Sequence, residues 1–511
     1  MSPARDTGAS DAGASLLSKR IHRLAGERWV LLALGLATVL LLVARLWHIR
    51  ADFSDFSFYS QDGARFTDEG FYTSAALNHY IFGHAYMPGG WNPGVFMPVW
   101  PMMTGLVFAL TGVSLAAARS LSVLCCWASV ALVYAVSRQY RGVLFAAIAA
   151  SLAAANALGF LFGRLALLEP ALTAYLLLAL YLAGRVRRGG YGLAVLAGVV
   201  FAIAALTKTT AMFVLPAILY PVWANNREDR AAAWKLTGTA LGTAVLLLEA
   251  AKVFWFSRFP ADAAIILGMA PLWQIEQAPM RLVRFLFRGT WIDPILFPLA
   301  LIGFGAALVR LRVLWRDTLF VAAFLWETGY AAFIVYHVDG PPRYFAAMVA
   351  PTVWLAMILA EWALREKPRL GAVLAALIAV SAAWNAGMIA DYLAHPHFRM
   401  RNASLAIKQT VLQGGATVQP YKSLLIGRGA DQVSLESDGF PAMDSDGTMP
   451  LARKLDVYRP GWFMDSSDGP GLRTATVGED RTMTPVARFP GLNPYTGSGI
   501  RLYRLAPKTQ P

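Results

Sequence analysis

The stretch WVLLALGLATVLLLVARLWHI, residues 29–49, is almost wholly apolar and follows a segment rich in Ala, Gly and Ser. A helix of about 20 residues spans the hydrocarbon core of a bilayer, because each residue adds about 1.5 Å. No small-residue cleavage pattern follows the stretch, so we expect a retained first transmembrane helix rather than a signal peptide. Residues 1–28 are then a basic N-terminal tail that stays in the cytoplasm.

The composition of the whole chain extends this prediction to many helices. The 511 residues are 57% hydrophobic and only 15% charged, whereas soluble domains carry roughly 25% charge, and the mean hydropathy is +0.48. The net charge of +14 comes mostly from short loops between apolar runs, which is an orientation signal and not a nucleic-acid site. Adjacent Cys125 and Cys126 offer neither a disulfide framework nor metal-ligand spacing.

Short basic loops predict how the chain crosses the membrane. If every such loop is cytoplasmic, the pattern gives about eleven transmembrane helices, with the N-terminus inside and the C-terminus outside; the loops contain Arg138/Arg141, Arg185/Arg188, Arg227/Arg230, Arg310/Arg316 and Arg365/Arg369. Segment 95–111 is apolar too, but counting it would place these arginines outside. Since prolines interrupt it, we expect a juxtamembrane or re-entrant piece of a long first outer loop.

The composition changes again from Asp391 onward, where apolar runs shorten and Gly, Pro, Asp and Ser increase. We expect a helix over 401–412 and strands over 423–426, 474–477 and 500–504. The predicted fold class is therefore an all-α polytopic membrane domain, residues 29–390, with juxtamembrane helices in its first outer loop. A soluble α/β domain outside the cytoplasm, residues 391–511, follows it.

The heptapeptide Phe66-Thr67-Asp68-Glu69-Gly70-Phe71-Tyr72 lies in the first outer loop. Thr67 or Asp68 can cap a short helix that Gly83 would end, which places Asp68 and Tyr72 on one face. Backbone N–H groups at a helix start keep a carboxylate ionised, as a base that accepts a hydroxyl proton requires. A solvated helix cap is the simpler interpretation of the same residues.

Other charges also depart from the cytoplasmic pattern and are costly at membrane depth. Asp52, Asp55 and Asp62 make the first outer loop acidic, together with the heptapeptide. Arg164 and Glu169 occupy a short outer turn, and Lys208 stands alone between two apolar helices.

Arg281, Arg284 and Arg288 form the clearest basic pattern on the outer side. Their spacing puts the three guanidinium groups on one face of an amphipathic helix at the membrane interface. Arginine clusters favour phosphate, because their forked donors match its oxygens. Attraction to anionic lipid headgroups explains the pattern equally well. The histidine spacings do not resemble a zinc site, and no P-loop, dinucleotide fingerprint or nucleophile-elbow serine occurs.

With these residues, the chain resembles the C-type membrane glycosyltransferases that use polyprenyl-phosphate sugars. It looks closest to the bacterial branch with lipid A aminoarabinose transferases and relatives of the protein O-mannosyltransferases. The resemblance covers roughly residues 29–390 and rests on the order of five motifs, namely Asp68-Glu69-x-x-Tyr72, Asn92-Pro93, Gly163-Arg164…Leu168-Glu169-Pro170, Leu206-Thr207-Lys208 and Pro342-Arg343-Tyr344.

The resemblance implies roles for individual residues. Asp68 would be the base or essential acid, with Glu69 and Glu169 as further catalytic carboxylates. The substrate and its phosphate would be held by Tyr72, Asn92, Arg164, Lys208, Arg281, Arg284, Arg288, Arg343 and Tyr344. At Asn92 the aminoarabinose transferases have a lysine, and at Trp91 an acidic residue, so this chain departs from the pattern of a lysine-held phosphate and a metal.

The sequence therefore predicts an inverting glycosyltransferase of the bacterial inner membrane, with its active site facing away from the cytoplasm. A polyprenyl-phosphate sugar is the expected donor, and a lipid, glycan or protein the acceptor. No cofactor is indicated, and a divalent metal stays open. A lipid or solute transporter is the rival, which would predict inverted repeats and paired broken helices. An inert scaffold would leave the acidic loop and the arginines unexplained.

Overall fold

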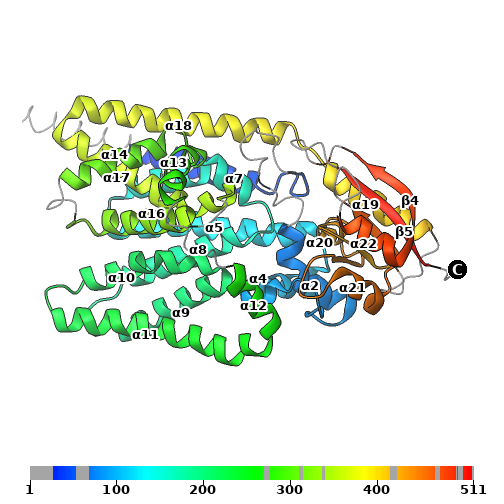
Figure 1. Ribbon diagram of the computed structural model, residues 1–511. Coiled ribbons are helices and arrows are strands. Elements are labelled where there is room, and N and C mark those ends of the chain that lie inside the picture. Colours follow the sequence, from blue (N-terminus) through cyan, green and yellow to red (C-terminus); the bar gives the residue numbers. More distant parts are fainter. Residues whose placement is uncertain are drawn as a thin grey trace, which may run out of the picture.

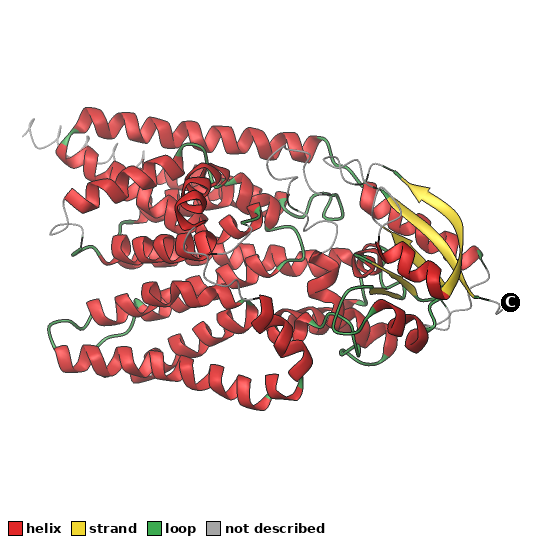
Figure 2. Cartoon of the chain, in the orientation of Figure 1, coloured by secondary structure: helices red, strands yellow, loops and turns green. Residues whose placement is uncertain are grey.

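A bundle of helices and a small sheet domain lie at opposite ends of the computed structural model, as Figures 1 and 2 show. The structure describes residues 27–52, 62, 68–269, 277–309, 315–336, 340–414, 423–465, 472–490, 492 and 499–508. The short helices labelled α2, α4 and α12 lie where the bundle meets the sheet domain in Figure 1.

The bundle consists of long apolar helices and a few shorter ones. Its helices are Glu27–Ala44 and α5 Leu115–Tyr140, α6 Val143–Ala155, α7 Ala157–Phe162, α8 Leu168–Ala183, α9 Tyr191–Thr207, α10 Leu215–Ala224, α11 Arg230–Phe254, α14 Leu296–Val309, α16 Thr318–Tyr336, α17 Val349–Glu366 and α18 Pro368–Ala394. Short 3₁₀ turns join some of them, among which η2 spans Thr209–Val214 and η6 spans Pro342–Met348.

Six helices in the described part of the chain are long and apolar enough to cross a membrane, and six more apolar helices have 10–17 residues. One of the shorter six is α4, Val99–Thr111, which follows α3, Pro93–Phe96. With 13 residues, α4 is shorter than the roughly 20 that a span needs. A mainly helical chain with several apolar helices and a C-terminal sheet is thus confirmed, whereas the number eleven stays a prediction.

Helix α2, Asp68–Phe82, crosses the junction between the bundle and the sheet domain and confirms the helix expected there. It ends because Gly83 adopts φ +82°, a left-handed conformation that glycine tolerates, while its N–H donates to the His79 carbonyl at 3.0 Å. Thr67, the other expected cap, lies outside the described residues. Two more short helices are α12, Pro260–Met269, and α13, Ala278–Arg288, which packs against α16 in the bundle.

The C-terminal domain holds a five-stranded mixed sheet of order β2-β1-β3-β5-β4. Strand β1 is parallel to β2 and β3, and β5 is antiparallel to β3 and β4. The elements are α19 Arg399–Gln413, β1 Leu425–Gly427, α20 Ala430–Glu436, β2 Ala442–Asp444, α21 Leu451–Tyr458, β3 Trp462–Asp465, α22 Leu472–Asp480, β4 Arg481–Phe489 and β5 Ile500–Pro507.

Alternation along the strands buries both faces of this sheet. Leu425 of β1 packs with Ile407 and Val411 of α19 on one face. The next residue, Ile426, packs with Leu455 of α21 and Val477 of α22 on the other. The predicted strand 474–477 is therefore wrong: it belongs to α22, because Val477 is buried against the sheet while Glu479 and Asp480 on the same helix are exposed.

Candidate functional site

Five charged side chains from distant parts of the chain meet at the junction end of the bundle, and we call Asp62, Asp68, Glu169, Lys208 and Arg343 the open cluster. The Arg343 guanidinium pairs with the Asp62 carboxylate and lies 2.6 Å from Asp68 Oδ2. The backbone N–H of Arg343 also donates to Asp62 Oδ2 at 3.0 Å. Residue 343 is therefore held by Asp62 through both its backbone and its side chain.

A second ion pair of the open cluster joins Glu169 in the first turn of α8 to Lys208, which directly follows α9. Glu169 Oε1 lies 3.9 Å from Arg343 Nε, so the two pairs are neighbours. The aromatic ring of Tyr344 lies beneath both cations, with Lys208 Nζ 4.1 Å and Arg343 Cζ 5.3 Å from its centroid. These distances are favourable for cation–π attraction.

The side chains of the open cluster differ in how much of their surface is exposed. The exposed fraction of the side chain is 18% for Asp68, 12% for Arg343 and 1% for Glu169. Glu169 Oε2 and Arg343 Nε accept and donate no hydrogen bond within the described part of the chain, although both atoms are buried. Buried polar atoms are costly without a partner, so these two atoms are suited to contact a bound molecule.

Tyr72 of α2 contributes a buried phenol to the same region. Burial raises its pKa well above the ordinary value, and the neighbouring Asp68 carboxylate raises it further, while Arg343 opposes both effects. The hydroxyl is therefore neutral at physiological pH and can donate a hydrogen bond. Asp68 and Tyr72 therefore lie close enough to interact, as their four-residue spacing predicts.

Glu169 lies on the wall of a mainly apolar cavity of about 60 Å³. Its walls come from α5, α7, α8 and α17, and include Val133, Phe162, Leu177 and Val349. The charged cluster thus has a hydrophobic space beside it.

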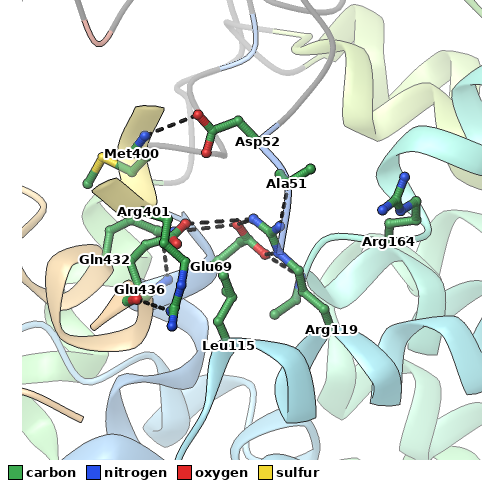
Figure 3. Close-up of polar contacts among 12 residues, drawn as sticks. Ala51, Asp52, Glu69, Leu115, Arg119, Arg164, Met400, Arg401, Gln432 and Glu436 are labelled. Carbon is green, nitrogen blue, oxygen red and sulfur yellow. Dashed lines mark hydrogen bonds and ion pairs between the residues drawn. The ribbon is translucent and has the colours of Figure 1, made fainter. Parts of the chain in front are cut away.

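Glu69 faces away from these groups, although it follows Asp68 directly. Its two carboxylate oxygens accept from Arg119 of α5 at 2.7 and 2.6 Å, and Oε1 also accepts from the Ala166 backbone N–H at 2.8 Å. Gln432 and Glu436 of α20 complete what we call the closed cluster, Glu69, Arg119, Gln432 and Glu436, which Figure 3 shows together. All four side chains are at most 1% exposed.

Arg164 and Asn92 contact protein groups outside the open cluster. Arg164 donates to the carbonyls of Trp47 and His48 and stacks 4.9 Å from the Tyr392 ring; Figure 3 shows it apart from the closed cluster as well. Asn92 is buried and donates to Asp262 Oδ1 at 3.2 Å while accepting from the Met87 backbone N–H. Both residues organise the segments around the site.

The arginines of α13 divide into buried and exposed members. Arg281 is buried and donates to the Tyr336 carbonyl at 3.0 Å, and Arg288 donates to the Gly340 carbonyl at 3.4 Å. Arg284 is exposed. Tyr336 and Gly340 both precede Arg343 in the chain. Arg281 and Arg288 therefore hold backbone carbonyls close to the open cluster. Binding of phosphate by the trio stays a prediction.

No group of three or more His, Cys, Asp or Glu residues within the described ranges is arranged to hold a metal ion. The carboxylates of the open cluster instead face the cations Arg343 and Lys208.

Four residues of these clusters were not among the site residues expected from the sequence, namely Asp62, Arg119, Gln432 and Glu436. Asp62 was one acid among several in the first outer loop, and its contact with Arg343 depends on the fold. Arg119 carried a usable signal, because it is a lone cation near the outer end of the apolar helix α5, against the positive-inside pattern.

Both the sequence and the fold of this chain are similar to those of known proteins. The profile of the dolichyl-phosphate-mannose-protein mannosyltransferase family matches residues 93–255. No curated protein matches the chain in sequence. Among solved structures, ArnT from Cupriavidus metallidurans bound to undecaprenyl phosphate is similar, with a TM-score of 0.59 and 14% identity, over 93% of this chain and 98% of that one.

Two structures of an archaeal enzyme are similar as well. The Archaeoglobus fulgidus oligosaccharyltransferase in complex with Zn and sulfate gives a TM-score of 0.53 at 13% identity, over 85% of this chain and 67% of that one. AglB from the same organism, with an inhibitory peptide and a dolichol-phosphate, gives 0.51 at 13% identity, over 95% and 75%. These TM-scores show the shared fold, and together with the family profile they confirm the resemblance of this chain to the polyprenyl-phosphate-dependent C-type membrane glycosyltransferases.

Proposed function

We propose that the chain is an integral membrane glycosyltransferase that moves a sugar from a polyprenyl-phosphate donor to a lipid, glycan or protein acceptor outside the cytoplasm. The observation that carries this proposal is the convergence of Asp68, Glu169, Lys208 and Arg343 from four separate segments. The family profile and the two relatives solved with polyprenyl phosphates support it.

Lys208 and Arg343 are the proposed phosphate ligands. Both are now paired with carboxylates, and a donor phosphate would compete for their N–H groups. The departing phosphate gains charge as the bond to the anomeric carbon breaks, and fixed cations in a poorly solvated site stabilise that charge. The ring of Tyr344 keeps the two cations side by side.

Asp68 is the proposed base. In the present state its carboxylate pairs with Arg343 at 2.6 Å. When a phosphate draws the guanidinium away, Asp68 can accept the proton of an acceptor hydroxyl that attacks the anomeric carbon. Attack opposite to the leaving phosphate inverts the anomeric configuration. Glu169 stays against Lys208 and orients it, and the first part of the isoprenoid chain would lie along the apolar residues beside Glu169.

The topology and location belong to the same proposal. Residues 1–28 would lie in the cytoplasm, residues 29–390 would form the transmembrane domain of a bacterial inner-membrane protein, and residues 391–511 would lie outside. The open cluster is at the end of the bundle that bears the C-terminal domain, so the reaction would take place on that outer side.

The test is donor turnover by purified protein in nanodiscs. Polyprenyl-phosphate-linked hexoses and pentoses with labelled sugars are each supplied with lipid, glycan or peptide acceptors. We expect acceptor-dependent release of free polyprenyl phosphate with at least one donor. Lys208→Met should reduce donor use at least about tenfold, whereas the control Lys235→Met on the exposed surface of α11 should leave it unchanged.

A transporter would behave differently in the same system. It would move the labelled lipid or solute across a liposome membrane without transferring the sugar. Movement without transfer, for every donor and acceptor, would replace the proposal with this alternative.

A further inference from the structure

The C-terminal domain contacts the helix that carries Asp68 at its first turn. The Gly70 N–H donates to Gln432 Oε1 at 2.7 Å, which satisfies one of the N–H groups that a helix start leaves without an intrahelical partner. The two backbones also touch at this point, since a Cβ on Gly70 would lie 2.2 Å from the Gln432 nitrogen. Helix α20 thus fits against α2 with no space for a side chain between them.

Gln432 also connects α2 to the rest of the site. Its amide nitrogen donates to Glu436 Oε1 at 3.2 Å and lies 3.4 Å from Glu69 Oε2. Glu69 in turn accepts from the Ala166 N–H at 2.8 Å. Ala166 is three residues before Glu169, and Asp68 is one residue before Glu69. The closed cluster, whose side chains Figure 3 shows, therefore links the chain next to Asp68 and the chain before Glu169 to α20.

The C-terminal domain contacts the chain beyond α2 as well. The Tyr458 hydroxyl donates to the Pro88 carbonyl at 2.6 Å, and the Met449 N–H donates to the Gly89 carbonyl at 3.1 Å. Helix α2 is consequently held from the same domain at its first turn and in the loop that follows it. Two separated attachments restrict both translation and rotation of α2.

We propose that Gln432 and Glu436 of the C-terminal domain are positioning residues for the transfer reaction, which fix the first turn of α2 and thereby the Asp68 carboxylate. The inference rests on the proposed function, since Asp68 must take part in catalysis for its position to matter. Small displacements of a reacting group are expensive: about 1 Å can cost about two orders of magnitude in rate.

Glu436 adds a dependence on pH to this arrangement. Burial raises the pKa of Glu436 to about 8, and its Oε2 accepts no hydrogen bond from any described residue. The groups around it are Arg119 from α5, Glu69 from α2, Asp52 from the segment before α2, and Arg401 from α19, which donates to the Glu436 carbonyl.

The sign of the effect follows from the raised pKa. Below about pH 8 the Glu436 carboxyl is protonated, and Arg119 then neutralises a single carboxylate of the closed cluster, Glu69. Above that pH a second buried carboxylate appears beside Glu69 and competes for Arg119, so the first turn of α2 loses support. The protonated Glu436 carboxyl stabilises the folded protein. This contribution to the free energy of unfolding is complete below the ordinary glutamate pKa and is lost as pH rises through about 8.

The first measurement compares Gln432→Ala with Gln413→Ala, a matched control at an exposed position of α19. We expect Gln432→Ala to lower kcat about tenfold or more with little change in donor KM, and to speed hydrogen exchange of the amides of residues 70–73. The control should change neither. Normal kcat in Gln432→Ala, with unchanged exchange, would overturn the proposal.

The second measurement uses Glu436→Gln, which keeps the shape of the side chain but does not ionise. We expect a near-normal rate at neutral pH and loss of the decline that wild-type protein shows above about pH 8. An identical decline in both proteins would contradict the role of Glu436. Absence of transfer by the wild type would refute the proposed function instead, while hydrogen exchange would still report whether Gln432 holds α2.

Discussion

Asp68 and Glu69 are neighbours in the chain, yet they belong to two regions with opposite properties. Asp68 is partly exposed in the open cluster and pairs with Arg343. Glu69 is fully buried in the closed cluster and accepts three hydrogen bonds from Arg119 and Ala166. Two acidic side chains at adjacent positions of one helix start thus have different environments.

The surroundings of the two carboxylates indicate which of them is available to react. In the open cluster three carboxylates share two cations, and two buried polar atoms of Glu169 and Arg343 lack partners among the described residues. In the closed cluster both oxygens of Glu69 are occupied by donors that water or substrate cannot displace easily. This difference supports the proposal that Asp68 takes part in the chemistry and that Glu69 supports the structure.

The largest expected effect is that of Asp68→Asn. The amide keeps the size of the side chain and removes the base, so kcat should fall by about 10²–10⁴ without a change in melting temperature. Steady-state transfer in nanodiscs measures the rate, and Asp480→Asn, at an exposed position of α22, is the control. Wild-type turnover by Asp68→Asn would remove this residue from the reaction.

Glu69→Gln should show the opposite pattern, a loss of stability. Removing one partner of a buried ion pair costs about 3–5 kcal/mol, because the other charge remains in a poorly solvated place. Here that charge is Arg119. We expect a lower melting temperature, while Glu479→Gln on the surface should melt like the wild type. Unchanged melting of Glu69→Gln would mean that the closed cluster does not hold the junction together.

An effect of intermediate size is expected at α13. Arg281→Ala removes the hydrogen bond to the Tyr336 carbonyl and loosens the segment before Arg343, so transfer should fall about tenfold. Exposed Arg284 is its matched control, and Arg284→Ala should stay within about twofold. Equal losses in both variants would favour direct phosphate binding by this helix.

The smallest effect is expected from Tyr72→Phe. Since burial raises the Tyr72 pKa well above its ordinary value, the phenol stays protonated at neutral pH. Its loss should lower the rate severalfold without moving any limb of the pH–rate profile. A new or shifted limb in Tyr72→Phe would show that the phenol titrates during the reaction.

Much of this arrangement was predictable from the sequence, because its causes are local or periodic. The apolar runs follow from hydrophobicity, and the end of α2 follows from the conformation that Gly83 adopts. The motifs around Glu169, Lys208 and Arg343 identified residues that the fold does bring together.

The remainder depends on contacts between residues far apart in the chain. Nothing near Gln432 predicts that its side chain meets Gly70, some 362 residues earlier. Segment 474–477 looked like a strand because of its threonines and valine, and tertiary burial of Val477 made it helical. Likewise, the separation of Glu69 from Asp68 could not be inferred, since only the position of Arg119 decides it.

The central claim is that the open cluster, and not α13, receives the donor phosphate. A structure of the protein determined with polyprenyl phosphate bound tests this claim most directly. We predict that the phosphate lies within hydrogen-bond distance of Lys208 and Arg343, with Arg343 drawn away from Asp68. A phosphate held by Arg281 and Arg284, with the pairs of the open cluster intact, would contradict the account.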